Sequence, residues 1–243
     1  MAIETGLNGK VVVVTGGAAG IGRATVEAFR AEGAHVYSWD VMVDPKIDVT
    51  KREDVDRAVN DVVAKHGRID VLINNAGIVR DAQIVKWKDG QVASTMDDAA
   101  FDAVINVNLK GVFVCTRAVA PHMIKASSGV ILMTSSIVGL YGNFGQTNYA
   151  ATKAGVISFA KTWSRELGRY GIRVNAIAPG FIATEMVKAM PPKVLESMAQ
   201  KTPLGRMGEP RDIANGFVWL ASDAAKFVSG AVLSVDGGLV LGT

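Results

Sequence analysis

The stretch VVVVTGGAAGIG, residues 11–22, joins four consecutive valines to a glycine-rich turn and decides the fold class. Val11–Val14 is a continuous β-branched run, typical of a strand buried on both faces. The turn that follows carries Gly16, Gly20 and Gly22, and an apolar helical pattern begins within it. A strand, a glycine turn and a helix in this order favour a phosphate-binding helix N-terminus. The alternative is a tight turn that holds no ligand.

Strands and helices alternate along the rest of the chain. The patterns predict further strands at 35–40, around 46–49, and at 69–74, 130–134, 173–178 and 231–235, and helices ending near 32 and at 50–67, 97–125, 147–170 and 210–222. Thr50 is expected to cap its helix with Glu53 as partner, in a capping box. Such alternation requires a parallel sheet with helices on both faces. We predict one doubly wound Rossmann-type α/β domain over residues 1–243, with about seven strands.

Two segments depart from this alternation. Arg80–Met96 is polar and irregular, and it is long for a connection between a strand and a helix. Its Trp87 and Lys88 are candidates to line the mouth of a substrate site. Phe181–Gln200 contains two consecutive prolines and is expected to form a mobile helical lid around 181–200.

Composition narrows the function classes. Apolar residues make up 49% of the 243 residues and charged residues 20%, which is typical of a globular protein. The net charge of +3 is too small and too scattered to indicate a nucleic-acid partner. No charged leader precedes an apolar segment, and no uninterrupted apolar run is long enough to span a bilayer. We therefore expect a cytoplasmic protein without a membrane partner.

The cysteine and histidine residues do not indicate a metal site. Cys115 lies in an apolar helical run, where a packed core thiol is expected. His35, His66 and His122 are widely separated and have no companion at the spacing of metal ligands. No metal is expected.

The stretch 136–153 carries the candidate chemistry. Tyr149 and Lys153 stand four residues apart at the start of a predicted helix, so they lie on one helical face. A nearby ammonium and the helix dipole favour a phenolate. Ser136 follows a buried strand, at the edge of the sheet where ligands of open α/β folds bind. A phenol beside a hydroxyl suits proton transfer at an alcohol or carbonyl oxygen. On most helices, however, a Tyr and Lys pair is only a solvated face.

Asp40 indicates the cofactor. It ends the second strand about twenty residues after the glycine turn, where a carboxylate accepts hydrogen bonds from ribose hydroxyls. No Arg or Lys lies among Gly17–Ala19, or at Val41 and Met42, to hold a 2′-phosphate. The predicted cofactor is NAD and not NADP. A helix or turn cap is the alternative role for Asp40.

These motifs together resemble the short-chain dehydrogenase/reductase family over essentially the whole chain. The matching motifs are Thr15-Gly16-x-x-x-Gly20-Ile21-Gly22, Asn74-Asn75-Ala76-Gly77, Ser136, Tyr149-x-x-x-Lys153 and Pro179-Gly180, in this order. The resemblance implies a nicotinamide-dependent oxidoreductase that interconverts a ketone and a secondary alcohol, usually as a homotetramer. A dinucleotide-binding regulator, which would not need Tyr149 and Lys153, and an isomerase or epimerase, which typically needs a larger substrate domain, are less favoured.

The resemblance also assigns catalytic roles. Ser136 would hold and polarise the substrate oxygen, and Tyr149 would be the acid in reduction and the base in oxidation. Lys153 would lower the pKa of Tyr149 and bind the nicotinamide ribose. Asn108 would anchor a water-linked proton relay to Lys153, with Asn106 as a competing candidate and a buried structural amide as the alternative for either. Ser135 is the rival of Ser136, but it is one residue out of the family's spacing.

The remaining assignments concern cofactor and substrate. Cofactor contacts implied by the family are Gly16, Gly20, Ile21, Gly22, Asp40, Asp48, Val49, Asn75, Ala76, Gly77, Tyr149, Lys153, Pro179, Gly180, Ile182 and Thr184. Substrate contacts would come from Ser136, Tyr149 and Gln146, whose amide could donate to a second carbonyl or merely brace its loop.

Residues 75–81 and 145–149 are most similar to 3-oxoacyl-thioester reductases, which act on carrier-protein or CoA thioesters. Many carrier-protein reductases have a basic cluster where this chain reads Ala126-Ser127-Ser128. The longer 80–96 segment is a second departure. Both favour a CoA thioester such as acetoacetyl-CoA, or a small ketone, over a carrier-protein substrate. The alternative function is a secondary-alcohol dehydrogenase or carbonyl reductase for small cyclic or aryl ketones.

Overall fold

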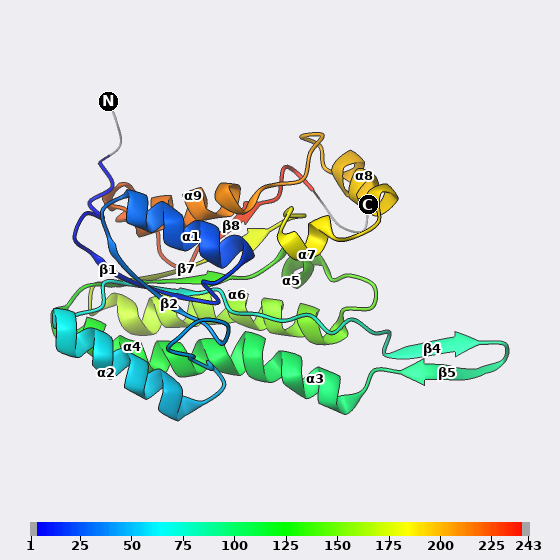
Figure 1. The fold of residues 1–243 in the computed structure, drawn as a ribbon, viewed down its shortest axis with the longest axis horizontal. Coiled ribbons are helices and arrows are strands. Elements are labelled where there is room, and N and C mark those ends of the chain that lie inside the picture. The colour runs from blue at the N-terminus through cyan, green and yellow to red at the C-terminus, as the bar shows by residue number, and fades with distance from the viewer. Residues whose placement is uncertain (1–3, 240–243) are drawn as a thin grey trace.

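A parallel sheet with helices on both faces forms the body of the molecule (Figure 1). The structure is a computed structural model, and it describes residues 4–239. The strands of the main sheet are β1 (Val11–Thr15), β2 (His35–Trp39), β3 (Val71–Asn74), β6 (Gly129–Thr134), β7 (Ile172–Pro179) and β8 (Val232–Val235). Their order is β2-β1-β3-β6-β7-β8, and every neighbouring pair is parallel. The predicted doubly wound α/β fold is confirmed.

Helices cover the two faces of the sheet. They are α1 (Gly20–Ala31), α2 (Arg52–His66), α3 (Asp98–Ile105), the π-helical segment η1 (Asn106–Lys110), α4 (Gly111–Ala126), α5 (Ile137–Tyr141), α6 (Thr147–Gly168), α7 (Glu185–Lys188), α8 (Pro192–Lys201), α9 (Pro210–Ala221) and the 3-10 turn η2 (Asp223–Ala225). Helices α1 and α9 pack together over one face, and α2, α4 and α6 cover the other (Figure 1).

Two apolar cores hold these layers together. Phe29 of α1 and Phe217 of α9 belong to one core, and Val55 of α2 and Val156 of α6 belong to the other. All five residues of β1 are buried, because this central strand is covered on both faces. The strand order changes direction between the paired strands β1 and β3, so the chain continues from their carboxyl ends toward opposite sides of the sheet. Ligands of doubly wound sheets bind at such a point.

The expected strand around Lys46–Val49 is not formed, so the main sheet has six strands among residues 4–239. The connection after β2 turns back on itself, because the Ile47 amide donates to the Asp40 carbonyl at 2.9 Å. The expected Thr50 cap is also wrong. Its hydroxyl donates to Asp48 Oδ1 at 2.7 Å, and Lys51 precedes α2 without a side-chain cap.

The segment expected to be irregular, 80–96, contains an antiparallel hairpin of β4 (Val85–Lys88) and β5 (Gln91–Thr95). Asp89 and Gly90 turn between the strands with φ of 52° and 78°. An Asp-Gly pair is a strong hairpin signal because both turn positions need positive φ. The hairpin projects away from the body (Figure 1). Trp87 on it is 66% exposed and does not line the cleft described below.

The 181–200 segment carries α7 and α8, with Pro192 opening α8 as prolines commonly do. The helical character expected there is confirmed, while its mobility stays a prediction. The run 98–126 is one continuous helical stretch that could cross a membrane by length and composition, although charged residues such as Lys110 and Arg117 interrupt its apolar sequence. Half of its most apolar window is buried inside the fold, and α4 packs on α2, β3 and β6, as a core helix does.

Among the described glycines, Gly22 leaves the least room for a side chain. A Cβ there would lie 1.9 Å from the Gly16 carbonyl oxygen, which belongs to the backbone and cannot move as a flexible side chain would. We expect Gly22→Ala to lower the free energy of unfolding by about 2 kcal/mol or more, since overpacking of this kind costs ~1–3 kcal/mol. Urea unfolding measures the change.

The matched control is Gly168→Ala at the end of α6, where a Cβ would meet nothing within 4 Å. Alanine favours helix over glycine by at most about 1 kcal/mol, so this variant should be as stable as the wild type or slightly more so. Equal stability of the two variants would contradict the close approach at Gly22.

Candidate active site

A cleft of about 510 Å³ opens at the carboxyl ends of β1 and β3. Its lining is Gly16, Ala19, Gly20, Ile21, Trp39, Asp40, Val41, Met42, Ile47, Asp48, Val49, Asn75, Ala76, Gly77, Ile78, Val79, Val107, Thr134, Tyr149, Lys153, Thr184 and Glu185. The cleft therefore joins the glycine turn at one end to the Tyr149 and Lys153 pair at the other.

The glycine turn forms a cradle at the start of α1. Gly16 and Gly20 have φ of 64° and 52°, in the region that favours glycine. A Cβ on Gly16 would lie 2.8 Å from the Cα of Ala76, so the turn and the chain after β3 approach closely. Ala19 occupies the N-cap position of α1 and provides no side-chain cap. Of the first amides of α1, that of Gly20 meets the Glu185 carboxylate, so an anion already lies where the positive potential of the helix start favours a phosphate.

Asp40 fixes the end of β2 beside this turn. One carboxylate oxygen accepts from the Ala18 amide at 3.0 Å, and the other accepts from the Met42 amide at 2.9 Å. The side chain is 9% exposed and borders the cleft. Each carboxylate oxygen has a further lone pair, which a ribose hydroxyl can use.

Thr15, the last residue of β1, connects the ends of β1 and β3 through its hydroxyl. The sequence predicted no specific role for this residue. Its hydroxyl donates to the Ile73 carbonyl and accepts from the amides of Asn75 and Ala76 at 2.9 and 3.0 Å. The Asn75 amide group donates to the Gly16 carbonyl at 3.2 Å. The sequence signal that could have indicated this role is a threonine that directly follows the four valines of the buried strand. These hydrogen bonds fix the glycine turn relative to the residues that follow β3, and both segments line the cleft.

Ser136 and Ser135 have different surroundings. The Ser135 hydroxyl donates to the Lys153 carbonyl at 2.8 Å, so it ties β6 to α6. Ser136 precedes α5, accepts from the Val138 amide at 3.1 Å and is hydrogen-bonded to Tyr149. Of the two hydroxyls, only that of Ser136 meets the phenol, as the spacing of the family implied.

Lys153 is buried under Tyr149. Its Nζ lies 5.4 Å from the centre of the Tyr149 ring and donates to the Thr134 carbonyl at 2.7 Å. Asn108, in the π-helical segment η1, binds both backbone groups of Ile78, accepting from its amide at 2.8 Å and donating to its carbonyl at 2.9 Å. Gly77 adjoins both Asn108 and Lys153. The Asn108 side chain thus makes the contacts of a buried structural amide, and its part in a proton relay stays a prediction.

The pKa of Tyr149 is raised in this structure, whereas the resemblance implied that Lys153 lowers it. Burial raises the pKa of Tyr149 to about 12, the Ser136 hydrogen bond acts to lower it, and the charge of Asp81 raises it. Burial also lowers the pKa of Lys153 to about 8. The Lys153 ammonium donates to the Thr134 carbonyl and is itself destabilised by burial. Desolvation of the Tyr149 phenol therefore determines the direction of its pKa shift. The Tyr149 phenol is therefore neutral in this state.

Several predicted residues lie outside the cleft lining. Ile182 and Gly180 pack elsewhere: Ile182 lines a neighbouring cavity, and a Cβ on Gly180 would meet Asp236. Pro179 ends β7, and Gly22 packs against the Gly16 backbone. Their cofactor contacts stay predictions.

The Gln146 amide is also engaged within the protein. Its Nε2 donates to both oxygens of Asp81 at 3.1 and 3.0 Å, and its Oε1 accepts from Asn143 at 2.8 Å. Asp81 follows the predicted cofactor segment and received no role from the sequence. The contacts of Gln146 are those of a residue that braces its loop.

An ion pair spans the mouth of the cleft where no contact was predicted. Arg23 of α1 pairs with Glu185, the first residue of α7. The pKa of Glu185 is lowered mainly because its carboxylate accepts from its own backbone amide, and the charge of Arg23 and a hydrogen bond from the Gly20 amide act in the same direction. The ion pair joins the segment 181–200 to α1, the helix that follows the glycine turn. Both side chains are more than half exposed, so the pair itself contributes little stability.

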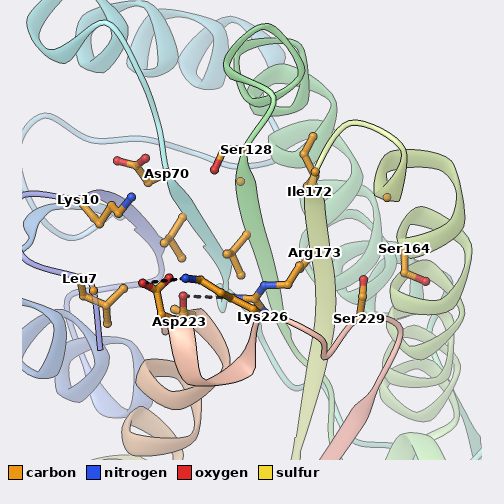
Figure 2. Close-up of a pocket in the computed structure, with 17 residues that line it drawn as sticks. Leu7, Lys10, Asp70, Ser128, Ser164, Ile172, Arg173, Asp223, Lys226 and Ser229 are labelled. Atoms are coloured by element: carbon orange, nitrogen blue, oxygen red, sulfur yellow. Dashed lines mark hydrogen bonds and ion pairs between the residues drawn. The ribbon is translucent and has the colours of Figure 1, made fainter. Parts of the chain in front are cut away.

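Another cavity, of about 390 Å³, lies at the amino ends of the strands, opposite the cleft (Figure 2). Four of the five charged side chains that line it have partners, and Asp70 pairs with Arg68. Asp223 pairs with Lys226 at 3.2 Å, and the Arg173 guanidinium donates to the Leu220 carbonyl at 2.7 Å. Within residues 4–239 no group of three or more His, Cys, Asp or Glu side chains could hold a metal ion. The cleft beside Tyr149 is therefore the candidate active site.

The buried ammonium predicts a pH-dependent stability. The pKa of Lys153 falls from 10.5 to about 8 on folding, so its charge destabilises the folded state below pH 8. Between these values the unfolded chain holds the proton and the folded chain does not, so stability rises with pH. We expect the wild type to gain up to about 3 kcal/mol relative to Lys153→Met between pH 7 and 10.5.

Urea unfolding of both proteins at each pH measures this difference, and all other titrations cancel in it. Lys161→Met on the exposed surface of α6 is the control, and its stability difference from the wild type should not depend on pH. A constant difference for Lys153→Met would mean that the ammonium is not destabilised by burial.

Comparison with known proteins agrees with this geometry. Residues 16–240 match the family described as enoyl-(acyl carrier protein) reductase. The chain is 48% identical to the 3-oxoacyl-(acyl-carrier-protein) reductase FabG of Thermotoga maritima, over 97% of this chain and 99% of that protein. It is 41% identical to the enzyme of the same name from Chlamydia trachomatis, over 95% and 97% of the two chains. The crystal structure of gox2181 superposes with a TM-score of 0.87, at 33% identity and over 95% of each chain. The chain therefore belongs to the short-chain dehydrogenase/reductase family and is a pyridine-nucleotide-dependent oxidoreductase acting on CH–OH groups.

Proposed function

We propose that this protein reduces short 3-oxoacyl thioesters, such as acetoacetyl-CoA, with NADH. The observation that carries the proposal is the placement of Tyr149 and Lys153 at one end of a cleft whose other end holds the glycine turn and Asp40, with Ser136 beside the Tyr149 phenol. A single elongated ligand can reach from the turn to the phenol through this cleft. The names of the FabG relatives add the substrate class.

The residues present fit a dinucleotide. The start of α1, where Ala19 supplies no side-chain cap and the Gly20 amide meets a carboxylate, suits a pyrophosphate, and the close contact of Gly16 with Ala76 leaves backbone as the wall of the cleft. The Asp40 carboxylate suits the two hydroxyls of an adenosine ribose and repels a 2′-phosphate. This charge is the basis for proposing NAD over NADP.

The catalytic groups act on the substrate oxygen. A bound NADH supplies the hydride that reduces the carbonyl carbon. Ser136 donates a hydrogen bond to the carbonyl oxygen, and Tyr149, which burial keeps protonated, gives its proton to that oxygen as the alcohol forms. The Lys153 ammonium stabilises the phenolate left behind, since an opposite charge nearby favours the ionised form.

The substrate proposal rests on a carbonyl oxygen as the proton acceptor. A hydroxyl and a phenol aimed at one point suit an oxygen on which negative charge develops, whereas reduction of a carbon–carbon double bond places its proton on carbon. This favours the reaction in the names of the FabG relatives over the one in the family description. The absence of a basic cluster at Ala126-Ser127-Ser128 supports a CoA thioester over a carrier protein.

Gln146 enters the proposal as a brace and not as a substrate anchor. Its amide is engaged by Asp81 and Asn143, which leaves Ser136 and Tyr149 to orient the substrate. A homotetramer is also part of the proposal. Phe113 on α4 and Trp219 on α9 are 41% and 39% exposed on the outer helices, where apolar side chains suit association of copies.

The first test concerns the cofactor. We expect kcat/KM to favour NADH over NADPH by at least about tenfold, because the 2′-phosphate would meet the Asp40 carboxylate. Asp40→Ser should narrow this ratio severalfold by removing the repulsion. Asp61→Ser, which removes an exposed carboxylate from α2, is the matched control and should leave the ratio unchanged. A wild-type preference for NADPH would refute the role of Asp40.

The second test concerns the substrate and the proton donor. Acetoacetyl-CoA should be turned over with NADH, and Tyr149→Phe should lower kcat by about 10²–10⁴-fold while NADH affinity in a fluorescence titration stays within a few-fold. The same assay includes small cyclic and aryl ketones. Turnover of these ketones with none of the thioester would move the assignment to a secondary-alcohol dehydrogenase or carbonyl reductase.

A further inference from the structure

Helix α7 lies beside the start of α1, at the mouth of the active-site cleft (Figure 1). Thr184 and Glu185, where α7 begins, both line the cleft, and so does Gly20, the first residue of α1. A Cβ on Gly20 would lie 3.3 Å from Thr184 Cγ2 and 3.9 Å from Glu185 Oε2. The first residues of the two helices therefore meet at a position where α1 carries no side chain.

The Glu185 carboxylate meets two donors of α1. Its Oε1 pairs with Nη2 of the Arg23 guanidinium. Its Oε2 is the oxygen that lies near Gly20, and the Gly20 amide donates to the carboxylate. Arg23 also lies 4.0 Å from the Glu27 carboxylate, measured from its Nε. An amide at a helix start and a guanidinium thus converge on one anion, and this anion belongs to the protein itself.

The position that this carboxylate occupies suits a phosphate equally well. The amides at the start of a helix carry the positive end of its dipole and bind phosphate groups. A guanidinium binds carboxylate and phosphate oxygens with the same planar set of N–H donors. The Gly20 amide has a single proton to donate, and two anions side by side repel each other. A carboxylate and a phosphate therefore exclude each other at this position.

We propose that Glu185 is an internal stand-in for the cofactor phosphate: its carboxylate occupies the Gly20 amide and the Arg23 guanidinium in the free protein, and the pyrophosphate of the dinucleotide replaces it there. Arg23 then becomes a ligand of the phosphate, and α7 is released from α1. The inference rests on the cofactor site of the proposed function, but not on the substrate or on the choice between NAD and NADP. Because the dinucleotide binds only where the carboxylate has moved away, the apparent affinity is reduced by the fraction of molecules that are open.

The first measurement is the affinity of the free protein for NADH, in a fluorescence titration. Glu185→Gln keeps the size of the side chain and removes its charge. We expect the Kd of NADH to fall about three- to tenfold at low ionic strength. The gain should shrink at about 1 M salt, because the Arg23 and Glu185 side chains are both more than half exposed.

The same titration with NADPH separates this inference from the proposed cofactor. Both dinucleotides carry the pyrophosphate, so Glu185→Gln should lower both Kd values by the same factor. A wild-type preference for NADPH would refute the role of Asp40 and leave this factor intact. A gain for only one of the two dinucleotides would contradict competition at the pyrophosphate.

Two controls test whether the competition is local. Glu27→Gln removes a carboxylate that lies 4.0 Å from the same guanidinium but one turn further along α1, and the Kd of NADH should stay within about twofold. ADP should displace bound NADH more readily from Glu185→Gln than from the wild type, whereas adenosine, which has no phosphate, should bind both equally. An unchanged Kd of NADH in Glu185→Gln, an equal gain in Glu27→Gln, or an equal gain for adenosine overturns the proposal.

The role of Arg23 is tested in the Glu185→Gln background, where the carboxylate no longer competes. There Arg23→Gln removes only the contact of the guanidinium with the phosphate, and the Kd of NADH should rise about three- to tenfold. Arg23→Lys should restore part of the affinity, because it keeps the charge but not the planar donors. An unchanged Kd in the double variant would mean that Arg23 is not a phosphate ligand.

A final measurement needs no nucleotide. Lys188 ends α7 and is exposed, so trypsin can cleave after it once α7 leaves α1. Loss of the ion pair should raise the rate of this cut about two- to fivefold in Glu185→Gln, since cleavage follows the population of the open form. Glu27→Gln should be cut at the wild-type rate. An unchanged rate in Glu185→Gln would show that the carboxylate does not hold α7 on α1, whatever cofactor the protein uses.

Discussion

The active-site cleft depends on a close approach of two backbone segments at the carboxyl ends of β1 and β3. A Cβ on Gly16 would lie 2.8 Å from Ala76, and a Cβ on Gly22 would lie 1.9 Å from the Gly16 carbonyl oxygen. The Thr15 hydroxyl fastens the same point by accepting from the amides that follow β3. Because no side chains intervene, the chain can bring a helix N-terminus and the Asp40 carboxylate to one wall of a narrow cleft.

The catalytic end of the cleft depends on burial. Lys153 is placed beneath Tyr149 by α6, and its ammonium is satisfied by the Thr134 carbonyl at the end of β6. Burial of both groups favours their neutral forms, which raises the pKa of one and lowers that of the other. The phenol is consequently kept protonated in this state, and burying both polar groups costs stability that a core of apolar side chains would not lose.

The 80–96 segment runs from the Tyr149 end of the cleft to an exposed hairpin. Its first residues are bound to the turn before α6 through Asp81 and Ala82, and the hairpin projects from there with little contact to the body (Figure 1). A two-stranded hairpin on its own is marginally stable in water. The apolar face that carries Trp87 and Val92 is exposed in this structure.

The sequence by itself determined the alternation of strands and helices, the glycine turn and the positions of Ser136, Tyr149 and Lys153, because these follow from local periodicity and backbone needs. The hairpin signal of Asp89 and Gly90 is also local. Only the tertiary structure decided that 46–49 turns back instead of forming a strand, and that Gln146 is bound by a carboxylate 65 residues away. It also decided the direction of the Tyr149 pKa shift. Burial and long-range partners set these outcomes, and neither is written in the residues next to the site.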